Sequence, residues 1–194
     1  MIKSSGLKKI STAVFISGTG SNLRSLIKFS KKKGSKFAIE LIISNNSKAK
    51  GLNYAQKFKI KKKIIDYSRK QNIDNKILKN LEKYNIKLIC LAGFMKILSQ
   101  NFIKKFNGKI INIHPSLLPK YKGLNPHQRI IDNKEKYSGC TVHFVNSKLD
   151  SGKIIIQKKV KVLKNDTANS LAKRILREEH ILYPKALNKL YFNL

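Results

Sequence analysis

The stretch TAVFISGTGSNLRSLIKF, residues 12–29, decides the fold because its periodicity changes partway along. Residues 12–16 are apolar or β-branched, which is typical of a buried strand. The next six residues, SGTGSN, contain two glycines and suit a tight turn. Leu23, Leu26 and Ile27 then recur at helical spacing. A strand, a turn and a helix in this order begin a strand–helix–strand unit, so the stretch predicts an α/β fold.

The same alternation continues through the first half of the chain. Apolar runs rich in β-branched residues are followed by segments with helical spacing, and such units in series pack as a mostly parallel sheet. The expected strands are 37–43, 63–66 and 87–92, and the expected helices are 51–58 and 73–84. The sequence therefore predicts a doubly wound sheet with helices on both faces.

The second half of the chain follows a different pattern. Strands are expected at 109–114, 139–145 and 153–160, and the last two have no helix-length segment between them. This spacing predicts an antiparallel C-terminal part. A final helix is expected from near Asp166, a suitable N-cap, toward Phe192, with a kink or break at Pro184. No repeat or linker divides the chain, so residues 1–194 are expected to form a single domain.

The formal charge of +32 allows two interpretations, a nucleic-acid partner or a biased composition. Only five of the 42 basic residues are Arg, whereas proteins that read bases and phosphates favour the bidentate guanidinium group. The lysines also run along the whole chain. Composition bias is therefore the preferred interpretation, and we expect no specific nucleic-acid partner. The positive field should still help to gather phosphorylated small molecules.

The sequence also bears on compartment and metal content. No apolar run approaches the roughly 18–20 residues of a membrane span, and the basic N-terminus lacks the apolar centre of a signal peptide. Cys90 and Cys140 lack metal-ligand spacing and lie in apolar, strand-like sequence. We therefore expect reduced, buried thiols, a cytoplasmic protein without a membrane partner, and no metal site.

The turn at residues 17–22 is a candidate anion site. Its glycines permit a tight turn, and backbone N–H groups at the start of a helix attract phosphate. It lacks the Gly-Lys-Ser/Thr of a Walker A loop and the third glycine of the dinucleotide fingerprint. An ordinary strand–helix turn is an equally good interpretation of this segment alone.

The segment NIHPSLLP, residues 112–119, carries the clearest chemical signal. Asn112 and His114 lie two residues apart on an expected strand, so their side chains share one face. Pro115 then ends ladder pairing near the carboxyl edge of the sheet, where open α/β sheets bind ligands. An imidazole transfers protons near neutral pH, and an amide N–H stabilises an oxyanion. A lone histidine bonded to a neighbouring carbonyl is the competing interpretation.

Two acidic residues could complete such a site. Asp150 precedes Ser-Gly in an expected loop, where it is either a turn former or the group that orients the imidazole. Glu179 falls on or beside the apolar stripe of the last helix, where a carboxylate needs a partner. His127 and His143 have weaker claims, the first as an exposed residue and the second as a satisfied sheet histidine.

Six segments together resemble the phosphoribosylglycinamide formyltransferases, also called glycinamide ribonucleotide transformylases, of the 10-formyltetrahydrofolate-using superfamily. These segments are ISGTGSNL, LAGFMKILS, INIHPSLLPKYKGL, TVHFV, LDSGKIIIQ and EEHILYP, in the order of that family. The resemblance implies a Rossmann-like formyltransferase fold. It also implies transfer of a formyl group from 10-formyltetrahydrofolate, as co-substrate, to the amino group of glycinamide ribonucleotide in purine (IMP) biosynthesis.

The resemblance also implies residue roles. Asn112, His114 and Asp150 match the catalytic trio, and no metal is implied. Gly20, Ser21 and Asn22 match the loop that holds the substrate phosphate, and Glu179 matches the acid that holds its ribose. The folate-binding residues implied, besides Asn112, are Met95, Lys96, Ile97, Leu98 and either Arg69 or Lys70. Lys96 departs from the usual Arg, which weakens planar recognition.

Two rival interpretations remain, another enzyme of the same superfamily and a protein of a different class. Methionyl-tRNA formyltransferase would need an RNA-binding domain for which 194 residues leave no room. Formyltetrahydrofolate deformylase uses the same donor and normally carries an extra N-terminal domain, which this sequence lacks. A basic nucleic-acid-binding protein with a relict site is the alternative from a different class. The expected partners are the two small-molecule substrates, and the expected assembly is a monomer or a weak homodimer.

Overall fold

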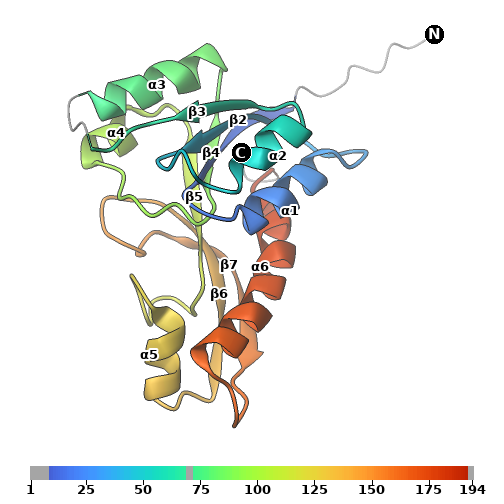
Figure 1. Ribbon diagram of the computed structural model, residues 1–194, viewed down its shortest axis with the longest axis vertical. Helices are drawn as coiled ribbons and strands as arrows, with labels where there is room; N and C mark the ends of the chain where they lie inside the picture. Colours follow the sequence, from blue (N-terminus) through green and yellow to red (C-terminus); the bar gives the residue numbers. More distant parts are fainter. Residues whose placement is uncertain (1–8, 69–71, 192–194) are drawn as a thin grey trace.

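Seven strands form one sheet in the computed structural model, which describes residues 9–68 and 72–191. The strand order across the sheet is β3-β2-β1-β4-β5-β6-β7 (Figure 1). The strands are β1 (Ile10–Ile16), β2 (Phe37–Ser44), β3 (Lys61–Ile64), β4 (Leu88–Leu91), β5 (Lys109–His114), β6 (Tyr137–Phe144) and β7 (Ile154–Lys161). The six helices in the described residues are α1 (Ser21–Ser30), α2 (Leu52–Lys57), α3 (Ile73–Lys83), α4 (Gln100–Lys105), α5 (Pro126–Asp132) and α6 (Ala168–Tyr191).

The sheet changes direction at β5. All pairings among β1, β2, β3, β4 and β5 are parallel, whereas β6 pairs antiparallel with both β5 and β7. This arrangement confirms the predicted α/β class with an antiparallel C-terminal part. Because β5 has a parallel neighbour on one side and an antiparallel one on the other, its carboxyl end adjoins loops from both halves of the sheet.

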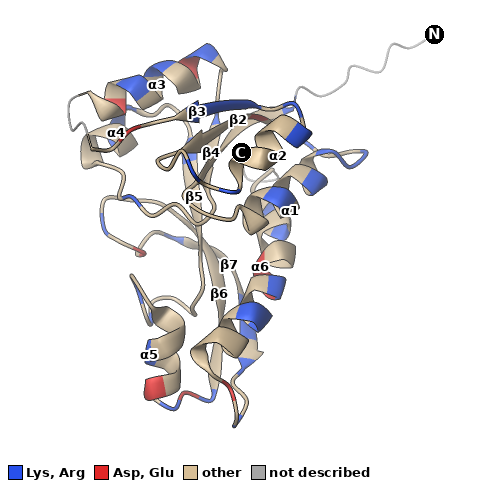
Figure 2. Ribbon diagram, viewed as in Figure 1, with Lys and Arg blue, Asp and Glu red and all other residues tan. Residues whose placement is uncertain are grey.

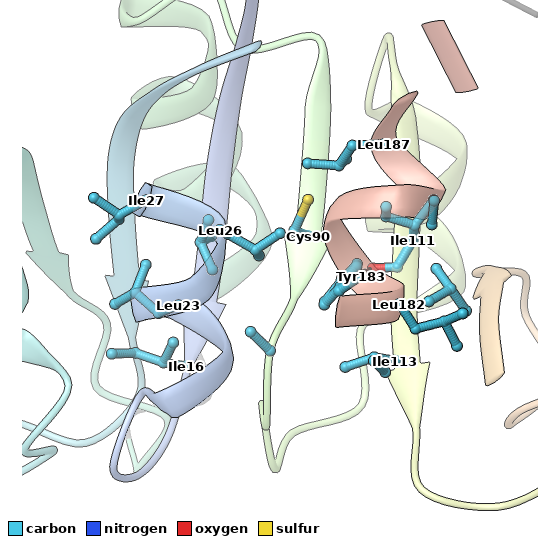
Figure 3. Close-up of a cluster of buried hydrophobic side chains, with 14 of the residues drawn as sticks. Ile16, Leu23, Leu26, Ile27, Cys90, Ile111, Ile113, Leu182, Tyr183 and Leu187 are labelled. Carbon is cyan, nitrogen blue, oxygen red and sulfur yellow. Dashed lines mark hydrogen bonds between the residues drawn. The ribbon is translucent and has the colours of Figure 1, made fainter. Parts of the chain in front are cut away.

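Helices cover both faces of the sheet, as the sequence predicted. Apolar residues of α3 and α4 pack on one face, and those of α1, α2, α5 and α6 pack on the other. Figure 3 shows α1 side chains and α6 side chains together over the strands that carry Cys90 and Ile111. Tyr183 of α6 is fully buried there, and its hydroxyl contacts the carbonyl oxygens of Leu91 at 3.0 Å and Ile111 at 3.2 Å. This side chain therefore ties α6 to β4 and β5.

A kink or a break was predicted at Pro184, and helix α6 continues through this residue, so the break is wrong. A proline removes one helical hydrogen bond, which leaves the carbonyl four residues earlier without its N–H partner. That carbonyl belongs to His180, and the hydroxyl of Ser25 on α1 donates to it at 2.5 Å. Burial of Tyr183, Ala186 and Leu187 around the proline holds the helix against the sheet.

Two further elements differ from the sequence-based expectation. Strand β3 lies two residues earlier than expected, at Lys61–Ile64, and all four of its residues are exposed. It is an edge strand, and its three lysines oppose pairing with another chain. Helix α4 was not predicted. Ser99 caps it by accepting a hydrogen bond from the Phe102 N–H at 2.9 Å, and Phe102 is fully buried.

Candidate active site

The candidate site lies at the carboxyl end of β5. Asn112 and His114 share one face of this strand, and β6 places His143 opposite Asn112 in the antiparallel register. Strand β5 ends at His114, in agreement with the prediction that Pro115 stops the ladder. The polar groups of two adjoining strands therefore meet at one edge of the sheet.

His114 is held at both ring nitrogens. Its side chain is almost fully buried, and its Nε2 lies 2.9 Å from the carbonyl oxygen of Tyr121. A carbonyl only accepts hydrogen bonds, so Nε2 carries a proton. The other nitrogen, Nδ1, lies 3.4 Å from Oδ2 of Asp150. A proton on Nδ1 would point at this carboxylate.

Asp150 lies in the loop between β6 and β7, facing two histidines. Its Oδ2 accepts a hydrogen bond from the Gly123 N–H at 2.9 Å, and its Oδ1 lies 3.6 Å from Nε2 of His143. The residue has φ of 46°, which Asp tolerates better than most residues. Gly152 lets the loop return to the sheet, because a Cβ there would lie 1.8 Å from the Phe144 carbonyl oxygen.

His143 sets the orientation of Asn112. The Nδ1 atom of His143 lies 2.8 Å from the Phe144 carbonyl oxygen and therefore carries the proton. Burial lowers the pKa of His143, so the ring is neutral and its Nε2 is an acceptor. The Asn112 Nδ2 lies 3.2 Å from this atom and donates to it. From the sequence His143 had only a weaker claim and this role was not predicted, although the pairing of strands 109–114 and 139–145 would have placed it opposite Asn112.

The glycine-containing turn opens α1, as predicted. Gly20 precedes the helix with φ of 73°, and a Cβ on it would lie 2.6 Å from the Gly51 Cα. Only glycine suits both conditions. No side chain caps the first turn of α1, so its N–H groups face outward as an anion site would require.

Glu179 of α6 lies behind this turn. Its carboxylate is buried, and its Oε2 accepts a hydrogen bond from the Asn22 Nδ2 at 2.7 Å. Burial raises the pKa of Glu179 to about 7, and the Asn22 bond opposes that shift. Within the described residues the Oδ1 of Asn22 is buried without a hydrogen-bond partner. The structure therefore joins the first turn of α1 to the predicted acid on α6.

A cleft of about 440 Å³ extends from the first turn of α1 to Glu179 and Pro115. Its wall includes residues 18–22, Gly93, Met95, Pro115 and Glu179. Asn112, His114 and Asp150 do not line it, but Pro115 directly follows His114 in the chain. His127, which was expected to be exposed, is half-buried in this wall, and burial lowers its pKa.

The expected folate segment lies beside the cleft. Met95 and Ile97 are 66% and 78% exposed, whereas Leu98 is buried. The Met95 N–H donates to the Ser17 hydroxyl at 2.7 Å, which fixes this segment to the turn before α1. The Nζ of Lys96 lies 5.8 Å from the centre of the Tyr67 ring. Arg69 and Lys70 lie outside the described residues.

The structure also bears on metal binding, thiol chemistry and membrane spanning. Residues 9–68 and 72–191 contain no group of three or more His, Cys, Asp or Glu side chains able to hold a metal ion. Burial raises the pKa values of Cys90 and Cys140 to about 12, so both thiols stay protonated at neutral pH. Over the same described ranges, none of the helices has both the length and the apolar character needed to cross a membrane.

Comparison with known proteins adds a family assignment. The formyl transferase family model matches residues 10–187. The phosphoribosylglycinamide formyltransferase of Haemophilus influenzae is 40% identical over 92% of this chain and 84% of its own length. The crystal structure of phosphoribosylglycinamide formyltransferase from Brucella melitensis has a TM-score of 0.89 and 42% identity, over 94% of this chain and 96% of that one.

Longer proteins contain a similar segment. The trifunctional purine biosynthetic protein adenosine-3 of Bos taurus is 44% identical over 93% of this chain, which spans only 18% of that protein. The family match covers nearly all of the described residues, including the turn at residues 17–22 and the segment 112–119. The chain belongs to the formyl transferase family.

Proposed function

We propose that this protein transfers the formyl group of 10-formyltetrahydrofolate to the amino group of N1-(5-phospho-D-ribosyl)glycinamide. The products would be N2-formyl-N1-(5-phospho-D-ribosyl)glycinamide, which enters purine (IMP) biosynthesis, and tetrahydrofolate. One observation carries the proposal. A single cleft runs from the uncapped first turn of α1, past buried Glu179, to Pro115 beside the histidine of β5. The family membership and the names of the relatives support the same reaction.

The cleft suits a phosphorylated ribose. The backbone N–H groups of Gly20, Ser21 and Asn22 would bind the phosphate, because the positive end of a helix dipole attracts an anion. Glu179 would accept hydrogen bonds from the ribose hydroxyls once it is ionised. Its distance from the turn is set by the Asn22 amide, which bonds directly to its carboxylate.

The residues of the sheet edge suit formyl transfer. The amine would attack the formyl carbon, and the formyl oxygen would gain negative charge. Asn112 has a second amide hydrogen besides the one bonded to His143, and a protonated His114 would carry a positive charge beside Asp150. Both groups would stabilise the oxyanion. The oxyanion would then collapse with cleavage of the bond between the formyl carbon and N10 of the folate. Asp150 would help to relay the proton lost by the amine, through water, to that leaving nitrogen. Transfer by these groups requires no metal ion.

The exposed loop after β4 suits the folate co-substrate. Met95 and Ile97 present apolar side chains to solvent beside the cleft, and such side chains make a wall for a flat ring system. Lys96, with Arg69 or Lys70, would contact the acidic end of the folate, while Leu98 would contact its ring. Asn112 would lie between the two substrates.

One assay tests the reaction against its nearest alternative. Purified protein is mixed with 10-formyltetrahydrofolate, with and without the ribonucleotide amine, and donor consumption is followed by absorbance. Consumption that depends on the amine is expected. Brisk consumption without an acceptor would instead identify a formyltetrahydrofolate deformylase, because the donor would then be hydrolysed. The proposal further places the enzyme in the cytoplasm as a monomer or weak homodimer, without a specific nucleic-acid partner.

A further inference from the structure

The carbonyl that holds His114 belongs to a residue with an unusual backbone conformation. Tyr121 has φ of 57°, in the left-handed region that bulky residues avoid. Its carbonyl oxygen lies 2.9 Å from the Nε2 of His114. A residue keeps such a conformation only where its surroundings fix it, and such residues concentrate at functional sites. The contacts of the Tyr121 side chain therefore bear on the histidine.

Arg129 of α5 and Glu135, which lies just after this helix, hold the Tyr121 side chain. Its hydroxyl donates to Oε1 of Glu135 at 2.9 Å, and the Arg129 guanidinium carbon lies 5.3 Å from its ring centre. The Nη1 of Arg129 also donates to the Lys122 carbonyl at 2.7 Å, directly after Tyr121 in the chain. Glu135 is itself fixed at the end of α5, because its N–H donates to the Ile130 carbonyl at 3.2 Å. The ring and the following peptide are thus both anchored to one helix.

We propose that Tyr121 is a positioning residue for His114, held in place by Glu135 and Arg129. The side-chain contacts fix the backbone of Tyr121, and its carbonyl then fixes the protonated nitrogen and the orientation of the imidazole. With Nε2 occupied in this way, Nδ1 faces Asp150. The proposal rests on the proposed function, because it concerns the residue that would stabilise the oxyanion. It goes beyond that function because it assigns a role to the side chains of Tyr121, Glu135 and Arg129, which would not contact the substrates.

Tyr121→Phe is the most direct test. It removes the hydroxyl that Glu135 holds, while the ring, its Arg129 contact and the backbone atoms remain. Since loss of alignment lowers turnover more than binding, kcat is expected to fall roughly tenfold while KM for both substrates stays within about twofold. Glu135→Leu should have the same effect. The double variant should be no worse than either single variant, because all three lose the same hydrogen bond.

Lys120→Met is the matched control. The Nζ of Lys120 donates to the same Glu135 oxygen at 3.0 Å, but its side chain is 68% exposed. Losing this contact leaves the Tyr121 hydroxyl bonded, so kcat should be unchanged. A fall in kcat as large as that of Tyr121→Phe would overturn the proposal, since the effect would then come from any change at Glu135.

A spectroscopic measurement separates this inference from the proposed function. At a pH where the His114 ring is neutral, its ¹⁵N shifts in the wild-type protein should report a proton on Nε2, and Tyr121→Phe should add the tautomer protonated on Nδ1. Lys120→Met should leave the wild-type spectrum. An unchanged His114 spectrum in Tyr121→Phe overturns the inference whatever the activity. Absence of formyl transfer in the wild-type protein would overturn the proposed function, and the spectra would still decide the role of Tyr121.

Discussion

At the scale of single residues, the carboxylate of Asp150 is the charged group shared by the two buried histidines of the site. Asp150→Asn keeps the size of the side chain, and Asn also tolerates the positive φ of this position. It removes the negative charge beside Nδ1 of His114 and the acceptor for the amine proton. We expect kcat to fall by about 10²–10⁴-fold, as for other losses of an acid–base group. KM for both substrates should change far less.

Ser151→Ala is a suitable control for Asp150→Asn, because its hydroxyl bonds only within the same loop, to Asn146 and Lys148. Steady-state kinetics of both variants would separate the effect of the lost charge on kcat from the effect of a disturbed loop. Near wild-type turnover in Asp150→Asn would remove Asp150 from the mechanism and leave it as a turn former.

Glu179 links stability to pH. Its pKa is about 7 in the folded protein against an ordinary value of 4.5, so the folded protein holds this proton more tightly than the unfolded chain. The resulting stability is fully present below about pH 4.5 and is lost as the pH rises through about 7. Glu179→Gln mimics the protonated form. Above pH 7 it should therefore raise the free energy of unfolding of the ligand-free protein by a few kcal/mol, the order expected for a shift of this size.

Urea unfolding of Glu179→Gln and the wild-type protein at pH 5 and pH 8 tests this linkage. The advantage of the variant should be larger at pH 8 than at pH 5. Its KM for the ribonucleotide should rise at the same time, because a neutral amide accepts weaker hydrogen bonds from ribose hydroxyls than a carboxylate. A stability difference that does not change with pH would contradict the raised pKa.

At the scale of elements, the continuity of α6 depends on a partner from α1. Pro184 leaves the His180 carbonyl without a helical N–H, and the Ser25 hydroxyl takes its place. Ser25→Ala should lower the free energy of unfolding by about 1–2 kcal/mol, because a partly buried acceptor loses its hydrogen bond. Thermal unfolding of Ser25→Ala beside Ser25→Ala/Pro184→Ala measures this. Restoring an N–H at position 184 should recover most of the loss, and equal losses in both variants would refute the pairing.

The turn before α1 offers a test of phosphate binding. Gly20 is unsuitable, since any side chain there meets the Gly51 backbone. Gly18 also lines the cleft, and a Cβ on it meets nothing within 4 Å. Gly18→Val should therefore fold normally and obstruct the anion site, so KM for the ribonucleotide should rise at least about tenfold while KM for the folate stays nearly constant. An equal rise in both KM values, measured by steady-state kinetics, would place the phosphate elsewhere.

The elements show which parts of the molecule the sequence can predict. Strands such as β1, β4 and β5 combine apolar and β-branched residues, so periodicity located them within a few residues. Helix α4 buries Phe102 alone among its residues and so lacks a periodic signal, whereas α2, of equal length, buries Leu52 and Ala55. The prediction at Pro184 considered only the local effect of a proline on a helix. Both outcomes depend on tertiary contacts, through buried Phe102 and through Ser25. Local propensity does not contain such contacts.

Some residues of the candidate site could likewise be predicted from the sequence, whereas the roles of others depend on tertiary structure. Asn112, His114 and Glu179 were located by their side-chain periodicity, which is a local property. The role of His143 depends on strand register, and that of Tyr121 depends on a backbone carbonyl, which its residue type does not reveal. The basic residue that would contact folate, Arg69 or Lys70, lies outside the described residues and stays a prediction.

At the scale of the whole molecule, positive charge spreads over the surface. Figure 2 shows Lys and Arg along α1, α3 and α6 and over the edge strand β3, with few acidic segments among them. The chain has 42 basic and 10 acidic residues, so the long-range field is positive. Lys173 brings one of these charges to the cleft itself. Such a field raises the encounter rate of anionic ligands and weakens with ionic strength.

The field should affect how fast the ribonucleotide is captured and leave the chemical step alone. Raising the salt from about 0.02 M to about 0.3 M shortens the screening length from roughly 20 Å to roughly 6 Å, so distant lysines cease to attract the phosphate. We expect kcat/KM for the ribonucleotide to fall several-fold over this range, while kcat stays nearly constant. The same amine without its phosphate should show a much flatter profile, because it lacks the charge on which the field acts. Equal salt dependence for the two amines would show that the lysines of this chain do not steer its substrate.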